Sequence, residues 1–333
     1  FSTFKQLPQA QTTPEFKSVD YNLGYAAYKL KNYTNVNTHF KGYIASATND
    51  AKKVDATLRL ADGYFVTKQY WPAMEMYNSI LTGNSQYKDY AAYQKAISYG
   101  FVDKNSTKIE ELQKFINTYI SSSLVDDAYY ELGSTYANAN QTAKALESFN
   151  HLIANHPNSN LISKAILRQG VVYVNANQED KGIERFKKVV TDYPGSQDAI
   201  EAVQNARAAY LETGKSSEFA SWVKTLDFVD ISTAELENDV YTAAENQLAQ
   251  NKSDAALVAL VDYINTYPNG LHATKAYFNV AEIYFGKDNV NEAKTNYENV
   301  LKRGKSEYSE PSLMRLSNMY LTANDEVNAK RVL

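Results

Sequence analysis

The chain has 333 residues, of which 44% are hydrophobic and 22% are charged, and its formal net charge is −4. The charges form no Lys/Arg block and no apolar run reaches the length of a membrane span, so neither nucleic acid nor a bilayer has an obvious binding segment. The chain has no cysteine, which excludes disulfides, thiolate metal ligands and a cysteine nucleophile.

Helical hairpins are predicted in close succession from the start of the chain. Residues 1–16 are expected to end a preceding repeat, because Phe4 and Leu7 fit the pattern of a second helix. Residues 17–333 are expected to form eight full hairpins and a ninth that is cut short, as a segment of a longer array, with a period of about 37 residues. The fold predicted is an all-α, right-handed superhelical solenoid of about nine alpha-alpha hairpins.

Three positions recur through these hairpins, and the first of them explains the 27 tyrosines. The tyrosine position, near the end of each first helix, carries Ala27, Tyr64, Tyr99, Tyr136, Tyr173, Tyr210, Gln247, Tyr284 and Tyr320. The small position, three residues earlier, is where two helices should approach closely and carries Gly24, Ala61, Ala96, Gly133, Gly170, Arg207, Ala244, Ala281 and Ser317. An apolar position in the second helix should fill the gap and carries Phe40, Tyr77, Leu112, Phe149, Phe186, Val223, Leu260, Tyr297 and Leu333.

In the fourth hairpin the helices are predicted over 127–139 and 142–155. Short polar residues such as Asn140, Asn177 and Gly214 mark the turns inside the hairpins, and prolines such as Pro157 stop the second helices. The stretch 207–236 departs most from the pattern, so local irregularity is expected there, either as a bend or specialised contact or as drift of one repeat.

The fourth unit reads Tyr129-x-x-Leu132-Gly133-x-x-Tyr136, then Ala145-x-x-x-Phe149, then Pro157. It resembles the tetratricopeptide repeat, with Tyr in place of the usual Trp. Segments 132–136 and 186–196 are similar to units of the barrel-assembly lipoprotein and the Tol-Pal accessory protein, and segment 218–236 is similar to an element of long Bacteroidetes arrays. The resemblance implies an exported scaffold of the bacterial cell envelope, periplasmic or associated with the outer membrane, with a cytoplasmic location as the alternative.

The resemblance also implies that the first helices line a concave groove that receives a protein or peptide. Aromatic side chains with a polar tip suit such a partly wet surface. The candidate binding residues are Tyr21, Tyr25, Tyr28, Phe65, Tyr93, Tyr130, Tyr241, Phe278 and Phe285. The alternative is that these side chains pack between neighbouring first helices.

No catalytic motif is readable, and the four histidines show no ligand spacing, so no catalytic residue, metal site or cofactor is predicted. The first functional hypothesis is a non-enzymatic scaffold for protein–protein interaction in envelope assembly or secretion, with neither nucleic acid binding nor direct membrane insertion. The alternatives are the helical part of a larger enzyme, for example a peptidoglycan-processing one whose catalytic domain lies outside this chain, and saccharide binding on the aromatic side chains.

Overall fold

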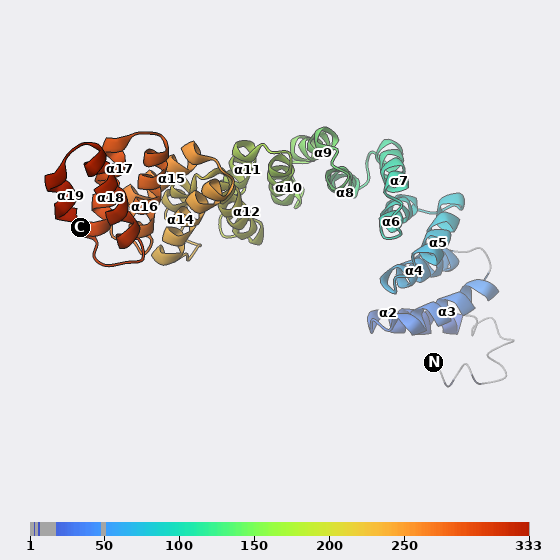
Figure 1. Ribbon diagram of the computed structural model, residues 1–333. Coiled ribbons are helices and arrows are strands. Elements are labelled where there is room, and N and C mark those ends of the chain that lie inside the picture. The colour runs from blue at the N-terminus through green and yellow to red at the C-terminus, as the bar shows by residue number, and fades with distance from the viewer. Residues whose placement is uncertain (1–2, 4–5, 7–17, 48–50, 333) are drawn as a thin grey trace. The chain divides into compact units, whose positions relative to one another are not determined.

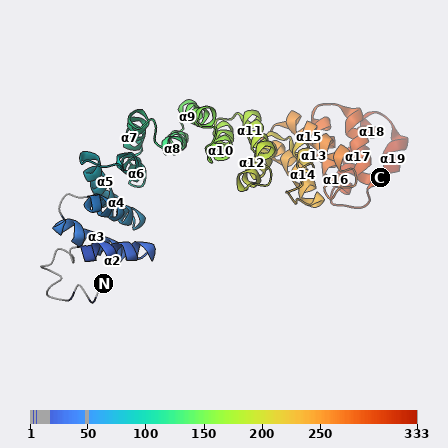
Figure 2. The same ribbon diagram turned by 180° about the vertical axis from the view of Figure 1, so that it is seen from behind.

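The computed structural model describes residues 3, 6, 18–47 and 51–332, and within them it contains eighteen α-helices and no strand (Figure 1, Figure 2). The prediction for residues 1–16, which rests on Phe4 and Leu7, and the apolar position of Leu333 lie outside the described residues. The helices alternate as first and second members of nine hairpins, which confirms the all-α prediction.

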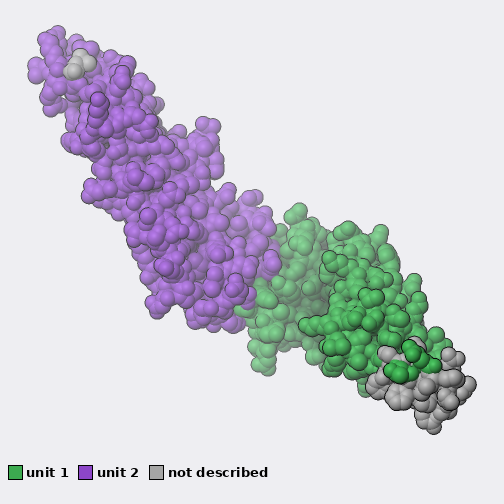
Figure 3. Space-filling view, turned by 90° about the horizontal axis from the view of Figure 1, so that it is seen from below, with its two compact units in different colours: residues 1–165 green, residues 166–333 purple. Residues whose placement is uncertain are grey.

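The first helices are α2 (Val19–Lys29), α4 (Ala51–Val66), α6 (Lys88–Gly100), α8 (Val125–Asn138), α10 (Ile162–Asn175), α12 (Gln197–Thr213), α14 (Thr233–Ala249), α16 (Ala273–Gly286) and α18 (Ser309–Thr322). The second helices are α3 (Tyr33–Ser46), α5 (Tyr70–Thr82), α7 (Asn105–Thr118), α9 (Thr142–Asn155), α11 (Glu179–Asp192), α13 (Ser216–Val223), α15 (Ser253–Thr266), α17 (Val290–Lys302) and α19 (Glu326–Val332). The chain divides into two compact units, Phe1–Ala165 and Ile166–Leu333 (Figure 3).

Every turn inside a hairpin has the same backbone conformation. One residue in each turn has a left-handed φ between 54° and 75°, namely Lys31, Lys68, Asp103, Asn140, Asn177, Gly214, Asn251, Asp288 and Asn324. The residue after it donates its N–H to the carbonyl of the tyrosine position five residues earlier, at 2.8–3.0 Å. This is the bond of a Schellman motif, which satisfies a helix-terminal carbonyl and needs a left-handed residue. Asn, Asp and Gly tolerate that conformation best, which explains the composition of the turns.

The small position allows the two helices of a hairpin to touch. A Cβ atom on Gly24, Gly133 or Gly170 would lie 2.9, 2.6 or 2.4 Å from the nearest ring atom of Phe40, Phe149 or Phe186. Each of these phenylalanines follows its glycine by sixteen residues and is at most 1% exposed. The ring thus occupies the space that a side chain at the glycine would need, as the sequence pattern predicted.

At the tyrosine position, three of the side chains lie against the second helix of the preceding hairpin. The hydroxyl of Tyr136 accepts a hydrogen bond from Gln113 Nε2 on α7 at 3.0 Å, and that of Tyr320 donates to Glu298 Oε1 on α17 at 2.9 Å. Lys187 of α11 places its Nζ 5.5 Å from the ring centroid of Tyr210. These tyrosines therefore join successive hairpins, and the hydroxyls of Tyr136 and Tyr320 are hydrogen-bonded.

The sixth hairpin differs from its neighbours. Its second helix, α13, has eight residues, whereas α11 and α15 have fourteen each. Arg207, the one large residue at the small position, makes two hydrogen bonds to the carboxylate of Asp239 on α14, at 2.6 and 3.0 Å. Two first helices, α12 and α14, are therefore joined directly by an ion pair at the place where the second helix is short.

Candidate functional site

The first three candidate residues, Tyr21, Tyr25 and Tyr28, form a half-buried cluster on α2. The ring centroids of Tyr21 and Tyr25 are 5.7 Å apart, and those of Tyr25 and Tyr28 are 6.4 Å apart. The hydroxyl of Tyr21 donates to Asp55 Oδ2 of α4 at 2.8 Å, and burial and this carboxylate raise the pKa of Tyr21. The ring of Tyr21 also lies 5.9 Å from that of Phe40 on α3, so the cluster packs on its own hairpin as well as on α4.

The other candidates in residues 1–165 are half-buried and packed against their own hairpin or the next. The ring of Phe65 contacts Tyr70 at 5.6 Å, that of Tyr93 contacts Phe115 at 5.8 Å, and that of Tyr130 contacts Phe149 at 5.9 Å. Phe65 lies at the end of α4, next to the turn, and its ring also lies 5.5 Å from that of Phe101.

The candidates in residues 166–333 differ in their exposure. Tyr241 is 2% exposed and its ring stacks on His272 at 4.3 Å, so it offers no surface to a partner. Phe278 is half-buried against Tyr308 at 5.2 Å, and the guanidinium of Arg315 lies 4.5 Å from the ring centroid of Phe285. The structure places the nine candidates in separate local clusters, and their role in binding stays a prediction.

A different set of residues forms hollows between consecutive first helices. The hollow between α6 and α8 has a volume of about 230 Å³ and is lined by Ile97, Gly100, Phe101, Asn105, Lys108, Glu131, Thr135 and Asn138. The hollow between α10 and α12, about 330 Å³, is lined by Val171, Val174, Asn175, Asn177, Glu179, Phe186, Asn205, Ala208, Ala209 and Glu212. The hollow between α14 and α16, about 360 Å³, is lined by Leu248, Ser253, Asn279, Glu282, Ile283, Gly286 and Lys287.

These three hollows use the same positions of the repeat. Asn105, Glu179 and Ser253 begin α7, α11 and α15 and are equivalent residues. Two further equivalent sets on the next first helix are Glu131, Asn205 and Asn279, and Asn138, Glu212 and Gly286. At least one amide or carboxylate side chain of these sets therefore lines each hollow, beside the first turn of a second helix, although Glu131 is already paired with Lys108 at 2.6 Å.

The sequence did not predict these hollows, because the expected binding residues were the aromatic side chains of the first helices. Asn205 and Asn279 are ordinary residues for an exposed helix, and only the packing of consecutive first helices shows that they line a concavity. The useful signal was the recurrence of Asn or Glu at a spacing of two repeats, as in Glu131, Asn205 and Asn279.

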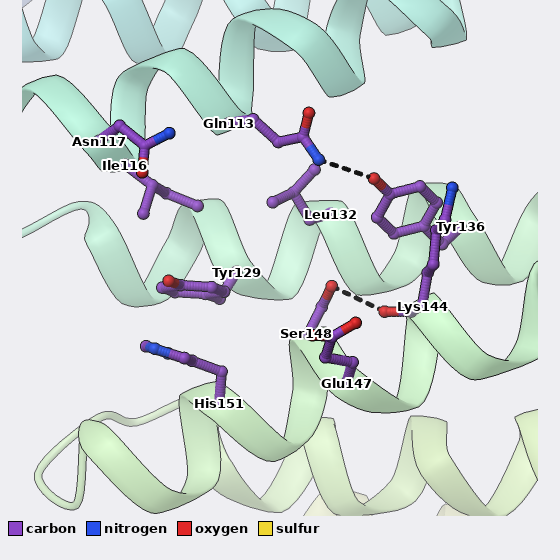
Figure 4. A pocket seen from close by; sticks show the side chains of 10 residues that line it. All are labelled: Gln113, Ile116, Asn117, Tyr129, Leu132, Tyr136, Lys144, Glu147, Ser148 and His151. Carbon is purple, nitrogen blue, oxygen red and sulfur yellow. Dashed lines mark hydrogen bonds between the residues drawn. The ribbon is translucent and has the colours of Figure 1, made fainter.

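A larger hollow of about 450 Å³ lies on the second-helix side of the fourth hairpin, between α7, α8 and α9 (Figure 4). The ring of Tyr129 stacks on that of His151, with centroids 3.9 Å apart, and these rings form one wall. Gln113 donates to the hydroxyl of Tyr136 on the other side, and the charged Lys144 and Glu147 are exposed. His151 Nδ1 is buried without a hydrogen-bond partner, and burial together with the nearby His156 lowers the pKa of His151.

In the described part of the chain, no group of three or more His, Asp or Glu side chains is arranged to hold a metal ion. Over residues 18–47 and 51–332, no helix combines the length and the apolar character that crossing a bilayer requires.

Comparison with known proteins agrees with this architecture. The tetratricopeptide repeat family matches residues 127–159 and 164–196, and a second group of the same repeat matches 274–303. These segments coincide with the hairpins α8–α9, α10–α11 and α16–α17. These matches show that the chain contains tetratricopeptide repeats, as its sequence pattern predicted. No curated protein matches it.

Several solved structures are similar to this chain. A tetratricopeptide repeat protein from Parabacteroides merdae is 14% identical, with a TM-score of 0.51 over 79% of this chain and 98% of that one. A MamA structure is 20% identical over 54% of this chain and 92% of its own, with a TM-score of 0.46. YrrB, described as a tetratricopeptide repeat protein with an unusual peptide-binding site, is 17% identical to this chain. The similarity covers 55% of this chain and 89% of YrrB, with a TM-score of 0.42. The P. merdae protein supports the all-α solenoid over most of the chain.

Proposed function

We propose that this protein is a non-enzymatic scaffold that holds an extended polypeptide along its first helices. The observation that carries the proposal is the recurrence of a polar hollow at the same repeat positions in α6–α8, α10–α12 and α14–α16. An extended polypeptide presents unpaired N–H and C=O groups at regular intervals. Asn and Glu side chains repeated along a solenoid can bond such groups without demanding a particular sequence.

Asn205 tests this proposal and has a close control in Asn296. Asn205 lines the hollow on α12, and its Nδ2 donates to the carbonyl of Glu201 at 2.9 Å. Asn296 on the second helix α17 makes the equivalent bond to the carbonyl of Glu292 at 2.8 Å and lines none of the hollows described above. The two residues thus have the same local role in their helices and differ in the surface that they face.

A dye-labelled peptide selected from a random displayed library on the purified chain would serve as the probe. The substitution Asn205→Ala should weaken binding by about fivefold, measured by fluorescence anisotropy, because one hydrogen bond is lost. Asn296→Ala should leave the affinity unchanged. If both variants bind the peptide as tightly as the unsubstituted chain does, the hollow is not part of the binding surface.

We further propose that the scaffold acts in cell-envelope assembly or secretion, exported to the periplasm. The support is the resemblance of segments 132–136 and 186–196 to units of envelope proteins. Fractionation of the source cells with a protease-accessibility assay tests the location: digestion after the outer membrane is opened is the expected result, and protection until the cytoplasm is opened would contradict it.

A further inference from the structure

The turns of the first three hairpins expose large apolar side chains. Leu30 is 80% exposed, Val66 51%, Trp71 56% and Phe101 55%. Each lies in, or within two residues of, the turn between the two helices of its hairpin. Because hairpins stack side by side, the turns of α2–α3, α4–α5 and α6–α7 lie along one edge of the unit that contains them.

The same turns carry exposed lysines. Lys29 and Lys31 flank Leu30, Lys68 follows Val66, and Lys104 closes the third turn. Among the described residues, none of these four lysines makes an ion pair. The five-residue turns 29–33, 66–70 and 101–105 contain four lysines and one carboxylate, that of Asp103, so their net charge is 4 − 1 = +3, whereas the whole chain carries −4.

The later turns show that the fold does not require this composition. The equivalent segments 138–142, 175–179, 212–216 and 249–253 have the same left-handed turn but contain no apolar residue larger than alanine. Their net charge is zero, from Glu179, Glu212, Lys215 and Lys252. The turn of the eighth hairpin exposes Val290 but has no aromatic residue and no net charge.

Lys31 and Lys68 also occupy a conformation that lysine disfavours. Their φ angles are 56° and 60°, at the position where the fourth, fifth and seventh hairpins have asparagine. A residue other than Gly, Asn or Asp rarely adopts this region, and one that does carries a conformational cost. Asparagine would therefore suit the backbone of these two turns better than lysine does.

We propose that this edge, formed by Leu30, Val66, Trp71 and Phe101 with Lys29, Lys31, Lys68 and Lys104, docks on the surface of an anionic lipid bilayer. Trp and Phe side chains enter the interfacial region of a bilayer, and lysines beside them attract anionic headgroups. The contact is peripheral, since only side chains at the turns enter the lipid. Phe101 also lines the hollow between α6 and α8, whereas Leu30, Val66 and Trp71 line no hollow, and the contact goes beyond the proposed function.

The shape of the edge favours a bilayer over an acidic protein partner. Leu30, Val66 and Trp71 project from turns and line none of the five hollows found in the described residues. A protein partner recognises a patch through pockets that receive its anchoring side chains, whereas a bilayer accepts projecting side chains without a matching surface.

Trp71 provides a direct probe, because the chain has only one other tryptophan, Trp222. In the variant Trp222→Phe, the emission of Trp71 should shift to shorter wavelength when vesicles of phosphatidylglycerol and phosphatidylcholine are added. Phosphatidylcholine alone should give little shift, and high salt should reverse the shift because it screens the lysines. No shift with either vesicle would overturn the proposal, as would a shift produced by polyglutamate but not by vesicles, which would identify a protein-binding surface.

Lysine variants separate binding from folding. Lys31→Asn and Lys68→Asn replace a disfavoured residue with one that suits the left-handed turn, so the protein should stay folded while two charges are lost. Co-sedimentation with the anionic vesicles should fall by about fivefold for each lysine removed. The control Lys252→Asn, in a turn of the other unit, should bind as the unsubstituted chain does. Equal loss in the control and in the two edge variants would contradict the assignment of this edge.

Discussion

At the residue scale, the contact between a glycine and a phenylalanine sixteen residues later determines how closely the two helices of a hairpin pack. Glycine in a helix is ordinarily unfavourable relative to alanine, so Gly133 is explained by the Phe149 ring that lies where a Cβ would be. The sequence predicted this contact because the small and apolar positions recur in register. The glycine is required by packing rather than by backbone conformation.

Gly133→Ala and Gly286→Ala should therefore change stability in opposite directions. A Cβ at residue 133 would overlap a fully buried ring, so the free energy of unfolding should fall by about 1–3 kcal/mol. Gly286 is likewise a glycine of a first helix, at the end of α16, but nothing lies within 4 Å of a Cβ there. Alanine at residue 286 should therefore raise the free energy of unfolding by up to about 1 kcal/mol. Denaturant unfolding of both variants measures this difference, and destabilisation of equal size in both would refute the steric explanation.

Asp62 is a buried carboxylate whose role was not predictable from sequence. It is 7% exposed, and its Oδ1 accepts hydrogen bonds from the hydroxyls of Tyr77 at 2.9 Å and Tyr90 at 3.1 Å. Burial raises the pKa of Asp62 above its ordinary value, although these bonds and Arg59 act in the opposite direction. Arg59, Tyr77 and Tyr90, from three different helices, meet at this carboxylate. Because they lie far apart in the sequence, the sequence alone does not predict the cluster.

Because the folded state binds the proton of Asp62 more tightly than the unfolded state does, protonation should stabilise the fold. The contribution of Asp62 to the free energy of unfolding should therefore grow as pH falls through its raised pKa toward 3.8, and decline as pH rises. The difference in unfolding free energy between the unsubstituted chain and Asp62→Asn isolates this effect from other carboxylates. A difference that is constant from neutral pH to pH 3.8, or that shrinks on acidification, would contradict it.

At the scale of elements, the turn inside each hairpin is the most regular feature of the molecule, and the sequence predicted it from Asn and Gly alone. The sequence did not indicate that Lys31, Lys68, Asp103 and Asp288 hold the same left-handed conformation, because lysine and aspartate are common elsewhere on a helix. The short helix α13 and the ion pair between Arg207 and Asp239 were also not derivable, since their partners come from different hairpins.

The turn conformation predicts opposite effects for two substitutions. Asn140→Ala places alanine at a φ of 54° and should lower the free energy of unfolding by about 1 kcal/mol. Lys68→Asn, at a φ of 60°, should raise it by a similar or smaller amount. Thermal and urea unfolding test both, and a loss of stability in Lys68→Asn would show that the lysine supports the turn in some other way.

At the scale of the whole molecule, the period of the repeat was enough to predict the fold, because each hairpin packs against its neighbours in sequence. The surfaces were harder to predict, since a hollow or an edge combines residues of several hairpins. The binding role of the aromatic candidates stays a prediction, and Tyr241 is the buried one among them, while the polar hollows and the lysine-bearing turns became visible only when the helices were placed.

The most direct measurement of the central claim is site-specific photocrosslinking in the source cells. A photoreactive amino acid in place of Glu212, which lines the hollow between α10 and α12, should form adducts with polypeptide that mass spectrometry can identify. The same amino acid in place of Glu184, an exposed residue of the second helix α11 that lines none of the hollows, should form few. Adducts in equal yield at both sites, or none at residue 212, would contradict the account that the first helices hold the partner.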